Sequence, residues 1–145
     1  MRYLKIITVI CFLSLASSCN NQKTSISYYD AVYGYAETVV IESSDKTEIY
    51  ISGQVGEGNT LKAQMLDALK NLKSQLQKHE ADYENLIKIN TYIVDYKPDD
   101  LNVFRDVRKE VFGENIVPAS TLVGVQSLAL PDWKIEIDAV AIIVK

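Results

Sequence analysis

Apolar and polar residues alternate with two different periods along the chain, and each period predicts one kind of element. Residues 38–41 and 48–51 are rich in β-branched side chains. The first run is followed by five polar residues, 42–46. This arrangement predicts a β-hairpin. From about residue 60 to residue 80, apolar side chains recur every three or four positions instead, which predicts an amphipathic helix. The apolar stripe of this helix comprises Leu61, Met65, Leu69, Leu72 and Leu76.

The second half of the chain repeats both signals. Residues 87–94 alternate apolar and polar side chains, which predicts a half-buried strand that stops before Pro98. Pro98 and the two acidic residues after it mark the start of a second amphipathic helix. Its apolar positions are Leu101, Phe104, Val107 and Val111. Residues 121–125 then predict a short strand, and residues 134–144 predict a long one.

The predicted order of elements is strand, strand, helix, strand, helix, strand, strand, which is typical of the α+β class. The simplest architecture for this order places two helices on one face of a mixed sheet. The other face stays open, and apolar side chains such as Val140, Ile142 and Val144 of the last strand are expected to point toward it. Self-association is the natural way to cover such a surface.

The N-terminus has the pattern of an export signal. Arg2 and Lys5 precede an apolar run of about ten residues, which is too short to span a bilayer as a helix. The run ends in small residues followed by Cys19, and this sequence resembles a bacterial lipobox, in which the cysteine becomes the lipidated first residue. Ordinary secretory cleavage, which leaves Cys19 unmodified, is the alternative.

These features divide the chain into three parts. Residues 1–18 are interpreted as a lipoprotein signal peptide, residues 19–32 as a polar tether, and residues 33–145 as the folded domain. We therefore expect an exported bacterial lipoprotein of the cell envelope, on the periplasmic or extracellular side, that contacts the membrane only through its N-terminal lipid anchor.

Composition narrows the function classes. With 145 residues, the chain has material for one globular domain. Its formal net charge of −4 disfavours binding to nucleic acid, which needs a basic face. Both cysteines, Cys11 and Cys19, precede the predicted domain, and His79 is the only histidine. The domain therefore lacks the residue types for a catalytic cysteine, a disulfide or a zinc–thiolate site, and no metal is expected.

Four short motifs, taken in order, resemble the pattern of the Rid (YjgF/RidA) family across residues 33–145. They are Gly34-Tyr35, Ser52-Gly53-Gln54, Pro118-Ala119-Ser120-Thr121 and Lys134-Ile135-Glu136-Ile137-Asp138-Ala139. The resemblance implies a chorismate-mutase-like fold and a homotrimer whose sheets form an inner barrel, with a small-molecule cleft between each pair of neighbouring subunits. It also implies hydrolysis of reactive enamines and imines, such as 2-aminoacrylate and its imine tautomer, to 2-oxoacids and ammonia, without a cofactor.

The resemblance assigns expected roles to four residues. Glu136 matches the catalytic-site glutamate of the family, and Tyr35 matches the aromatic residue of the cleft. The family binds the substrate carboxylate with an arginine directly after Pro-Ala, but this chain has Ser120 there. A hydroxyl makes a weaker hydrogen bond than a guanidinium, so affinity for a carboxylate should fall. Arg108 of the second predicted helix is a candidate to replace the missing charge.

Each of these roles has a simpler alternative. Glu136 alone is consistent with a solvated charge beside Lys134 on an exposed strand face, and Arg108 with a solvated charge on a helix surface. Two functions therefore stay open: an enamine or imine deaminase, and a non-catalytic trimeric lipoprotein that binds a small molecule in the same clefts. A structural lipoprotein with no ligand is a third reading.

Overall fold

A computed structural model describes residues 23–145 of the chain. The strands are β1 (Ser25–Tyr29), β2 (Thr38–Glu42), β3 (Lys46–Val55), β4 (Leu86–Val94), β5 (Ala119–Val125) and β6 (Ile135–Val144). The helices are α1 (Leu61–Gln77) and α2 (Asp100–Phe112), and a short 3-10 helix, η1, spans Tyr83–Asn85. Each strand and helix that the sequence predicts is present, and the α+β class is confirmed.

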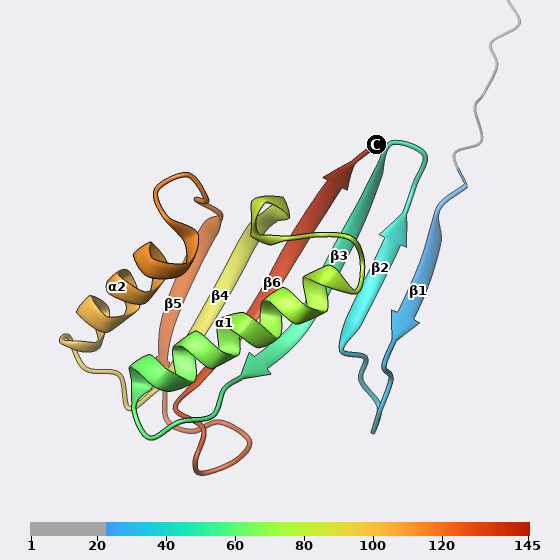
Figure 1. The fold of residues 1–145 in the computed structure, drawn as a ribbon. Coiled ribbons are helices and arrows are strands. Elements are labelled where there is room, and N and C mark those ends of the chain that lie inside the picture. The colour runs from blue at the N-terminus through green and yellow to red at the C-terminus, as the bar shows by residue number, and fades with distance from the viewer. Residues whose placement is uncertain (1–22) are drawn as a thin grey trace, which may run out of the picture.

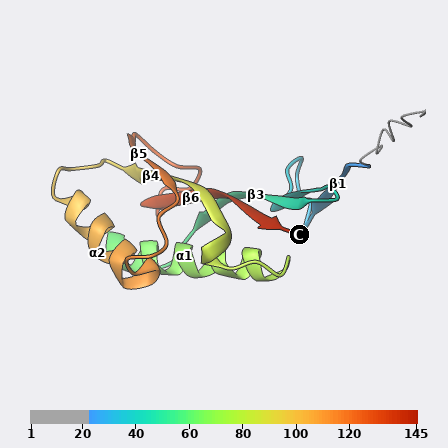
Figure 2. The same cartoon turned by 90° about the horizontal axis from the view of Figure 1, so that it is seen from above.

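The six strands form one mixed sheet in the order β1-β2-β3-β6-β4-β5. Neighbouring strands are antiparallel except β4 and β5, which are parallel. Both long helices cover the same face of this sheet, as Figure 1 and the view from above in Figure 2 show. The predicted architecture, two helices on one face of a mixed sheet, is therefore confirmed.

The hydrophobic core lies between the sheet and α1, with α2 closing its side near β5. Helix α1 begins after Thr60, whose side-chain oxygen accepts a hydrogen bond from the backbone N–H of Ala63 at 3.1 Å. Its apolar stripe is buried against alternate residues of the central strands. The largest apolar side chains that are almost fully buried there are Ile49, Met65, Leu69, Leu72, Leu76, Ile89, Ile93, Val107, Ile135 and Ile137.

The face of the sheet opposite the helices carries apolar side chains. Ala139 and Ala141 are buried toward the helices, so Val140 and Ile142, which alternate with them on β6, point to the open face. Val144 is 80% exposed, and Tyr50 lies opposite Val140 in the register of β3 and β6. The prediction that apolar residues of the last strand line an open face is confirmed.

The prediction of a tether over residues 19–32 is wrong for its second half. Residues 25–29 form β1, which pairs in antiparallel register with β2 along the edge of the sheet. The sequence did not reveal this strand because its large side chains are not buried within the chain: Ile26 is 55% exposed and Tyr28 is 68% exposed. Without a buried face, the segment has the mixed composition of a linker, although each of its five residues is in register with a residue of β2.

The predicted signal peptide, residues 1–18, and the predicted lipidation site Cys19 lie outside the described residues. Within residues 23–145, no helix is both long enough and apolar enough to cross a membrane.

Candidate functional site

The candidate site is built around an irregularity in the central strand β3. The register between β3 and β6 shifts between Ile51 and Gln54, so Ser52 and Gly53 interrupt the regular pairing. The Ser52 hydroxyl donates a hydrogen bond to the carbonyl of Ala36 at 2.6 Å, and the Ser52 N–H donates to the carbonyl of Glu37 at 2.9 Å. The Ser-Gly-Gln motif therefore fixes the loop that leads into β2.

Gly53 leaves room for the carboxylate of Glu136. A Cβ atom at position 53 would overlap with Glu136 Oε1, so no larger residue fits there unless Glu136 moves. Glu136 lies on β6, opposite Val55 of β3 and Tyr92 of β4, with its side chain on the open face of the sheet. Because the backbone of Gly53 lies so close to the Glu136 carboxylate, the Ser-Gly-Gln motif determines the space that this carboxylate occupies.

Glu136 is partly buried and has no partner among residues 23–145. No side chain or backbone group in that part of the chain forms a hydrogen bond or an ion pair with its carboxylate. Burial, and then the negative charge of Asp138, raise the pKa of Glu136 above its ordinary value. A carboxyl group that stays desolvated and unpaired is typical of a site that uses it chemically.

The raised pKa of Glu136 has a consequence for stability. The folded protein holds this proton more tightly than the unfolded chain, so stability falls as the pH rises from the ordinary pKa of 4.5 through the raised value, and the loss persists at neutral pH. Replacing Glu136 with Gln removes the desolvated charge. We expect Glu136→Gln to raise the melting temperature at pH 7.5 by on the order of 2 °C and to have no effect below pH 4.5.

The measurement is thermal unfolding followed by circular dichroism across this pH range. The control is Glu114→Gln in an exposed loop, which should leave the melting temperature unchanged at every pH. A lower melting temperature for Glu136→Gln at pH 7.5 would show that the carboxylate is stabilised, not strained, in the folded chain.

Asp138, two residues along β6 from Glu136, is held differently. Asn90 Nδ2 donates a hydrogen bond to Asp138 Oδ1 at 2.7 Å across the open face. On the neighbouring pair of strands, Lys88 Nζ donates to Thr121 Oγ1 at 2.6 Å. The hydrogen bond from Asn90 holds Asp138 in position beside Glu136, so Glu136 is the carboxylate of this pair that has no hydrogen-bond partner among residues 23–145.

Tyr35 is linked to the Ser-Gly-Gln motif through a second glutamate. The Tyr35 hydroxyl donates to Glu37 Oε1 at 3.4 Å, and Gln54 Nε2 donates to Glu37 Oε2 at 3.2 Å. Gln54 is only 6% exposed, whereas Tyr35 is 53% exposed. The network therefore connects an exposed aromatic ring to a buried amide, and it places Tyr35 and Glu136 on either side of the same motif.

Ser120 and Arg108 form a second group at the other edge of the sheet. Arg108 Nη1 of α2 donates to Ser120 Oγ of β5 at 2.6 Å. The guanidinium also lies 5.4 Å from the ring centre of Phe104 and 5.2 Å from that of Phe112. Burial lowers the pKa of Arg108 from its ordinary value, and no carboxylate among residues 23–145 pairs with it. Arg108 therefore brings a partly desolvated charge to the Ser120 hydroxyl.

The two groups do not meet within one chain. Ser120 is in register with Ile89, whose side chain is buried toward the helices, whereas Glu136 is in register with Tyr92. Ile89 and Tyr92 are three residues apart on β4, so Ser120 and Glu136 point to opposite faces of the sheet. In addition, Ser120 lies on the edge strand β5, and Tyr35 follows the opposite edge strand β1. A site that uses all four residues needs a second copy of the chain.

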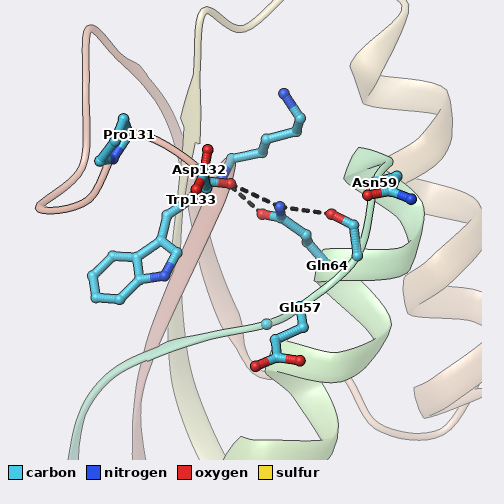
Figure 3. Close-up of a pocket in the computed structure, with 9 residues that line it drawn as sticks. Glu57, Asn59, Gln64, Pro131, Asp132 and Trp133 are labelled. Carbon is cyan, nitrogen blue, oxygen red and sulfur yellow. Dashed lines mark hydrogen bonds between the residues drawn. The ribbon is translucent and has the colours of Figure 1, made fainter.

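A hollow of about 500 Å³ lies away from these residues, between the loop after β3 and the loop before β6. Figure 3 shows Gln64 reaching from α1 between the two loops. Gln64 Nε2 donates to the carbonyls of Gly58 and Asp132 at 3.0 and 2.9 Å, and its Oε1 accepts from the N–H of Lys134 at 2.7 Å. Both the amide nitrogen and the amide oxygen of Gln64 are hydrogen-bonded within the fold, so we interpret this side chain as a contact that holds the start of β6.

Two features of the site could not be found in the sequence. Glu37 carries no motif of its own, and only the structure shows that it joins Tyr35 to Gln54. Phe104 and Phe112, whose rings lie beside Arg108, occupy positions of α2 that are equally typical of the apolar face that packs on the core, so the sequence does not single them out. Among residues 23–145, no group of three His, Cys, Asp or Glu side chains is arranged to hold a metal ion.

Comparison with known proteins places this geometry in context. A family model described as endoribonuclease L-PSP matches residues 26–143. A RutC family protein from Aquifex aeolicus is 33% identical over 105 residues, which cover 65% of this chain and 79% of that protein. A YjgF-family protein from Neisseria meningitidis has a TM-score of 0.69 at 25% identity, covering 81% of this chain and 93% of its own. A Yersinia pestis protein of unknown function from the conserved Rid family has a TM-score of 0.61 at 28% identity, covering 81% and 97%.

Proposed function

Because this chain belongs to the endoribonuclease L-PSP family, which includes the YjgF and Rid proteins, we propose that it hydrolyses small reactive imines and enamines to carbonyl compounds and ammonia. The observation that carries the proposal is the Glu136 carboxyl group, which is partly buried, unpaired within residues 23–145, and accommodated by the absence of a side chain at Gly53. This group supplies the acid–base chemistry that the reaction needs.

The hydrolysis requires one water molecule and the transfer of two protons from oxygen to nitrogen. Glu136, as a carboxylate, orients a water molecule and takes a proton from it as the oxygen bonds to the imine carbon. The same group returns this proton to nitrogen, which gives a carbinolamine. It then takes the proton of the carbinolamine hydroxyl and passes it to nitrogen as the C–N bond breaks, so that ammonia leaves as the carbonyl forms. A raised pKa suits Glu136 to both steps, because the protonated and ionised forms are then closer in free energy near neutral pH.

The site is proposed to form between subunits of a homotrimer. One chain supplies Glu136 and Tyr35, and its neighbour supplies Arg108 with Ser120. Within one chain, Ser120 and Glu136 point to different faces of the sheet, and Ser120 and Tyr35 lie at different edges. The apolar open face supports assembly, because it includes side chains such as Val140 that the helices do not cover. The bound ligand is a small molecule whose polar end contacts the guanidinium.

The role of Arg108 gives a testable expectation. Arg108→Ala removes the guanidinium that contacts Ser120, so KM for an imino acid should rise roughly 10- to 100-fold while kcat changes little, as expected for the loss of a charge-assisted hydrogen bond. Arg105→Ala, which removes an exposed arginine from the same helix, is the matched control and should leave KM unchanged.

Moving the charge to the strand should reverse the defect. Ser120→Arg combined with Arg108→Ala should recover most of the lost affinity, because the guanidinium then extends from the position that the family uses. Ser120→Arg alone places two guanidinium groups side by side and should not improve on the parent. An unchanged KM in Arg108→Ala would remove this residue from the site.

The experiment that tests the function uses purified protein and imines generated freshly in solution. Ammonia release and loss of the imine are followed together, and light scattering measures the molar mass of the assembly in the same buffer. Faster hydrolysis than in buffer, from a protein of three times the chain mass, is the expected result. A trimer that gives no acceleration with any imine would contradict the enzymatic proposal.

The alternative is a non-catalytic trimer that binds a small carboxylate, amide or carbonyl compound in the same clefts. The sequence resemblance favours it: Ser120 stands where the resemblance leads us to expect an arginine, and a charge reaches its hydroxyl from Arg108 of α2. In that case, replacing Glu136 or Arg108 should weaken ligand binding, and the parent should bind the ligand without hydrolysing it. Binding without hydrolysis would therefore decide for this alternative.

Ribonuclease activity, which the family description names, is not part of the proposal. The chain has a formal net charge of −4 and one histidine. That residue, His79, is hydrogen-bonded through Nε2 to Thr38 Oγ1 at 2.7 Å and has its ring edge-on to Tyr29, on the helix side of the sheet. Neither the negative net charge nor the placement of His79 suits a polyanionic substrate.

The proposal includes export and a lipid anchor on Cys19, which rest on the sequence pattern of residues 1–19. We expect that the mature protein in purified membranes begins at Cys19 and carries acyl groups. Intact-mass analysis distinguishes the possibilities, since an unmodified N-terminus or a retained signal peptide would contradict the anchor.

A further inference from the structure

An apolar pocket of about 370 Å³ lies beside Tyr35 in the loop between β1 and β2. Its walls include the side chains of Tyr28, Val32, Tyr33, Tyr35 and Val39. Tyr28 and Val39 are in register on neighbouring strands, and Val39 alternates with residues that are buried toward the helices. The pocket therefore opens on the same face of the sheet as Glu136.

The loop that forms this pocket holds a backbone conformation that its sequence disfavours. Tyr33 has a φ of 52° and Gly34 a φ of 91°, both in the left-handed region. A tyrosine in that region is strained, and its ring gains nothing from burial in the chain because Tyr33 is 99% exposed. A bend of the backbone at this point could be formed with glycine, so the bend does not explain the tyrosine at position 33.

One strand of the sheet, β3, lies between the β2 side of the pocket and β6, which carries Glu136, and Tyr28 lies one strand further out on β1. The N–H of Ser52 donates to the carbonyl of Glu37 at 2.9 Å, so the loop that follows Tyr35 lies directly beside β3. On its other side, β3 pairs with β6 at Val55 and Glu136. Two strand spacings between β2 and β6 amount to about 10 Å between the backbones. The register adds an offset along the strands, because Val39 is aligned through Tyr50 with Val140, four residues from Glu136. A ligand with its reacting carbon at Glu136 thus reaches the tyrosines only through a large side chain.

We propose that the pocket lined by Tyr28, Tyr33 and Tyr35 binds the side chain of the substrate, and that the preferred substrates are imines with an aromatic side chain. The inference rests on the hydrolase function proposed above and adds its substrate class. Three phenol rings offer edge-to-face contacts to an aryl group, and Val32 and Val39 supply apolar contact. The methyl group of an alanine-derived imine is too short to reach this pocket.

The test compares two imines that differ only in the side chain. Imines of phenylalanine and alanine are generated in solution by an amino-acid oxidase, and kcat/KM is measured for each with the parent, with Tyr33→Asn and with Leu130→Asn. Asn tolerates the left-handed backbone at position 33, and Leu130 is an exposed apolar loop residue outside the pocket. The parent should prefer the phenylalanine imine by about tenfold or more, Tyr33→Asn should bring the ratio of the two kcat/KM values close to one, and Leu130→Asn should keep the ratio of the parent.

Equal kcat/KM values for the two imines in the parent, or an unchanged ratio in Tyr33→Asn, would overturn the inference and leave the hydrolase function standing. A binding measurement separates the two claims when neither imine is hydrolysed. Titration with 3-phenylpropanoate and propanoate, followed by NMR, should give at least tenfold tighter binding of the aryl compound in the parent and no difference in Tyr33→Asn. Equal binding of both compounds by the parent would overturn the aromatic site independently of catalysis.

Discussion

Replacement of Glu136 with Gln should lower the rate of imine hydrolysis by roughly 10²- to 10⁴-fold, the range expected for loss of a general acid–base group. The amide has the size of the carboxyl group but neither accepts nor returns a proton at neutral pH. Steady-state rates of ammonia release at saturating imine measure the effect. Asp138→Asn is the matched control, because it removes a neighbouring carboxylate of β6 that Asn90 already holds, and it should keep activity within about tenfold of the parent.

The stability of the same variant makes the result easy to interpret. Because Glu136→Gln is expected to melt at a higher temperature than the parent at neutral pH, a loss of activity cannot be attributed to unfolding. Activity close to that of the parent in Glu136→Gln would remove the carboxylate from the chemistry and leave the binding alternative in front.

Gly53→Ala should cause a loss of about 100-fold, although position 53 contributes no functional group. The added methyl group overlaps with Glu136 Oε1, so the carboxylate must move, and a displacement of about 1 Å in a reacting group has an effect of this size. The displaced atoms are the end of a flexible side chain, so the fold and the molar mass of the assembly should be unchanged.

A double-mutant cycle shows whether the two positions act as one unit. In a protein that already carries Glu136→Ala, adding Gly53→Ala should cause no further loss, since the clash partner is absent. Additive losses would mean that Gly53 acts through the backbone of β3 and not through the carboxylate.

Much of the fold could be predicted because most elements bury one face within the chain. Helix α1 and strand β6 show this most clearly, since their buried residues recur with periods of about four and two. Strand β1 was missed because Ile26 and Tyr28 stay exposed in the single chain. The second half of β3 was missed because the bulge at Ser52 and Gly53 interrupts the alternation on which the prediction depended.

The site could be predicted only in part, for a different reason. Glu136 and the Ser-Gly-Gln motif were found through resemblance to a family, and the structure supplies the contact at Gly53 that connects them. Arg108 was a candidate with no geometric support, since its contact with Ser120 depends on how α2 packs against β5. Such a contact is set by the tertiary structure and leaves no periodic pattern in the sequence.

The proposed division of the site between two chains links activity to concentration. Any site shared by two chains is lost on dissociation, so dilution of a secreted protein would reduce the fraction of complete sites by mass action. The proposed lipid anchor counteracts this, because chains confined to a membrane surface explore two dimensions and meet at a much higher effective concentration. In this protein the anchor would therefore sustain assembly of the site as well as determine its location.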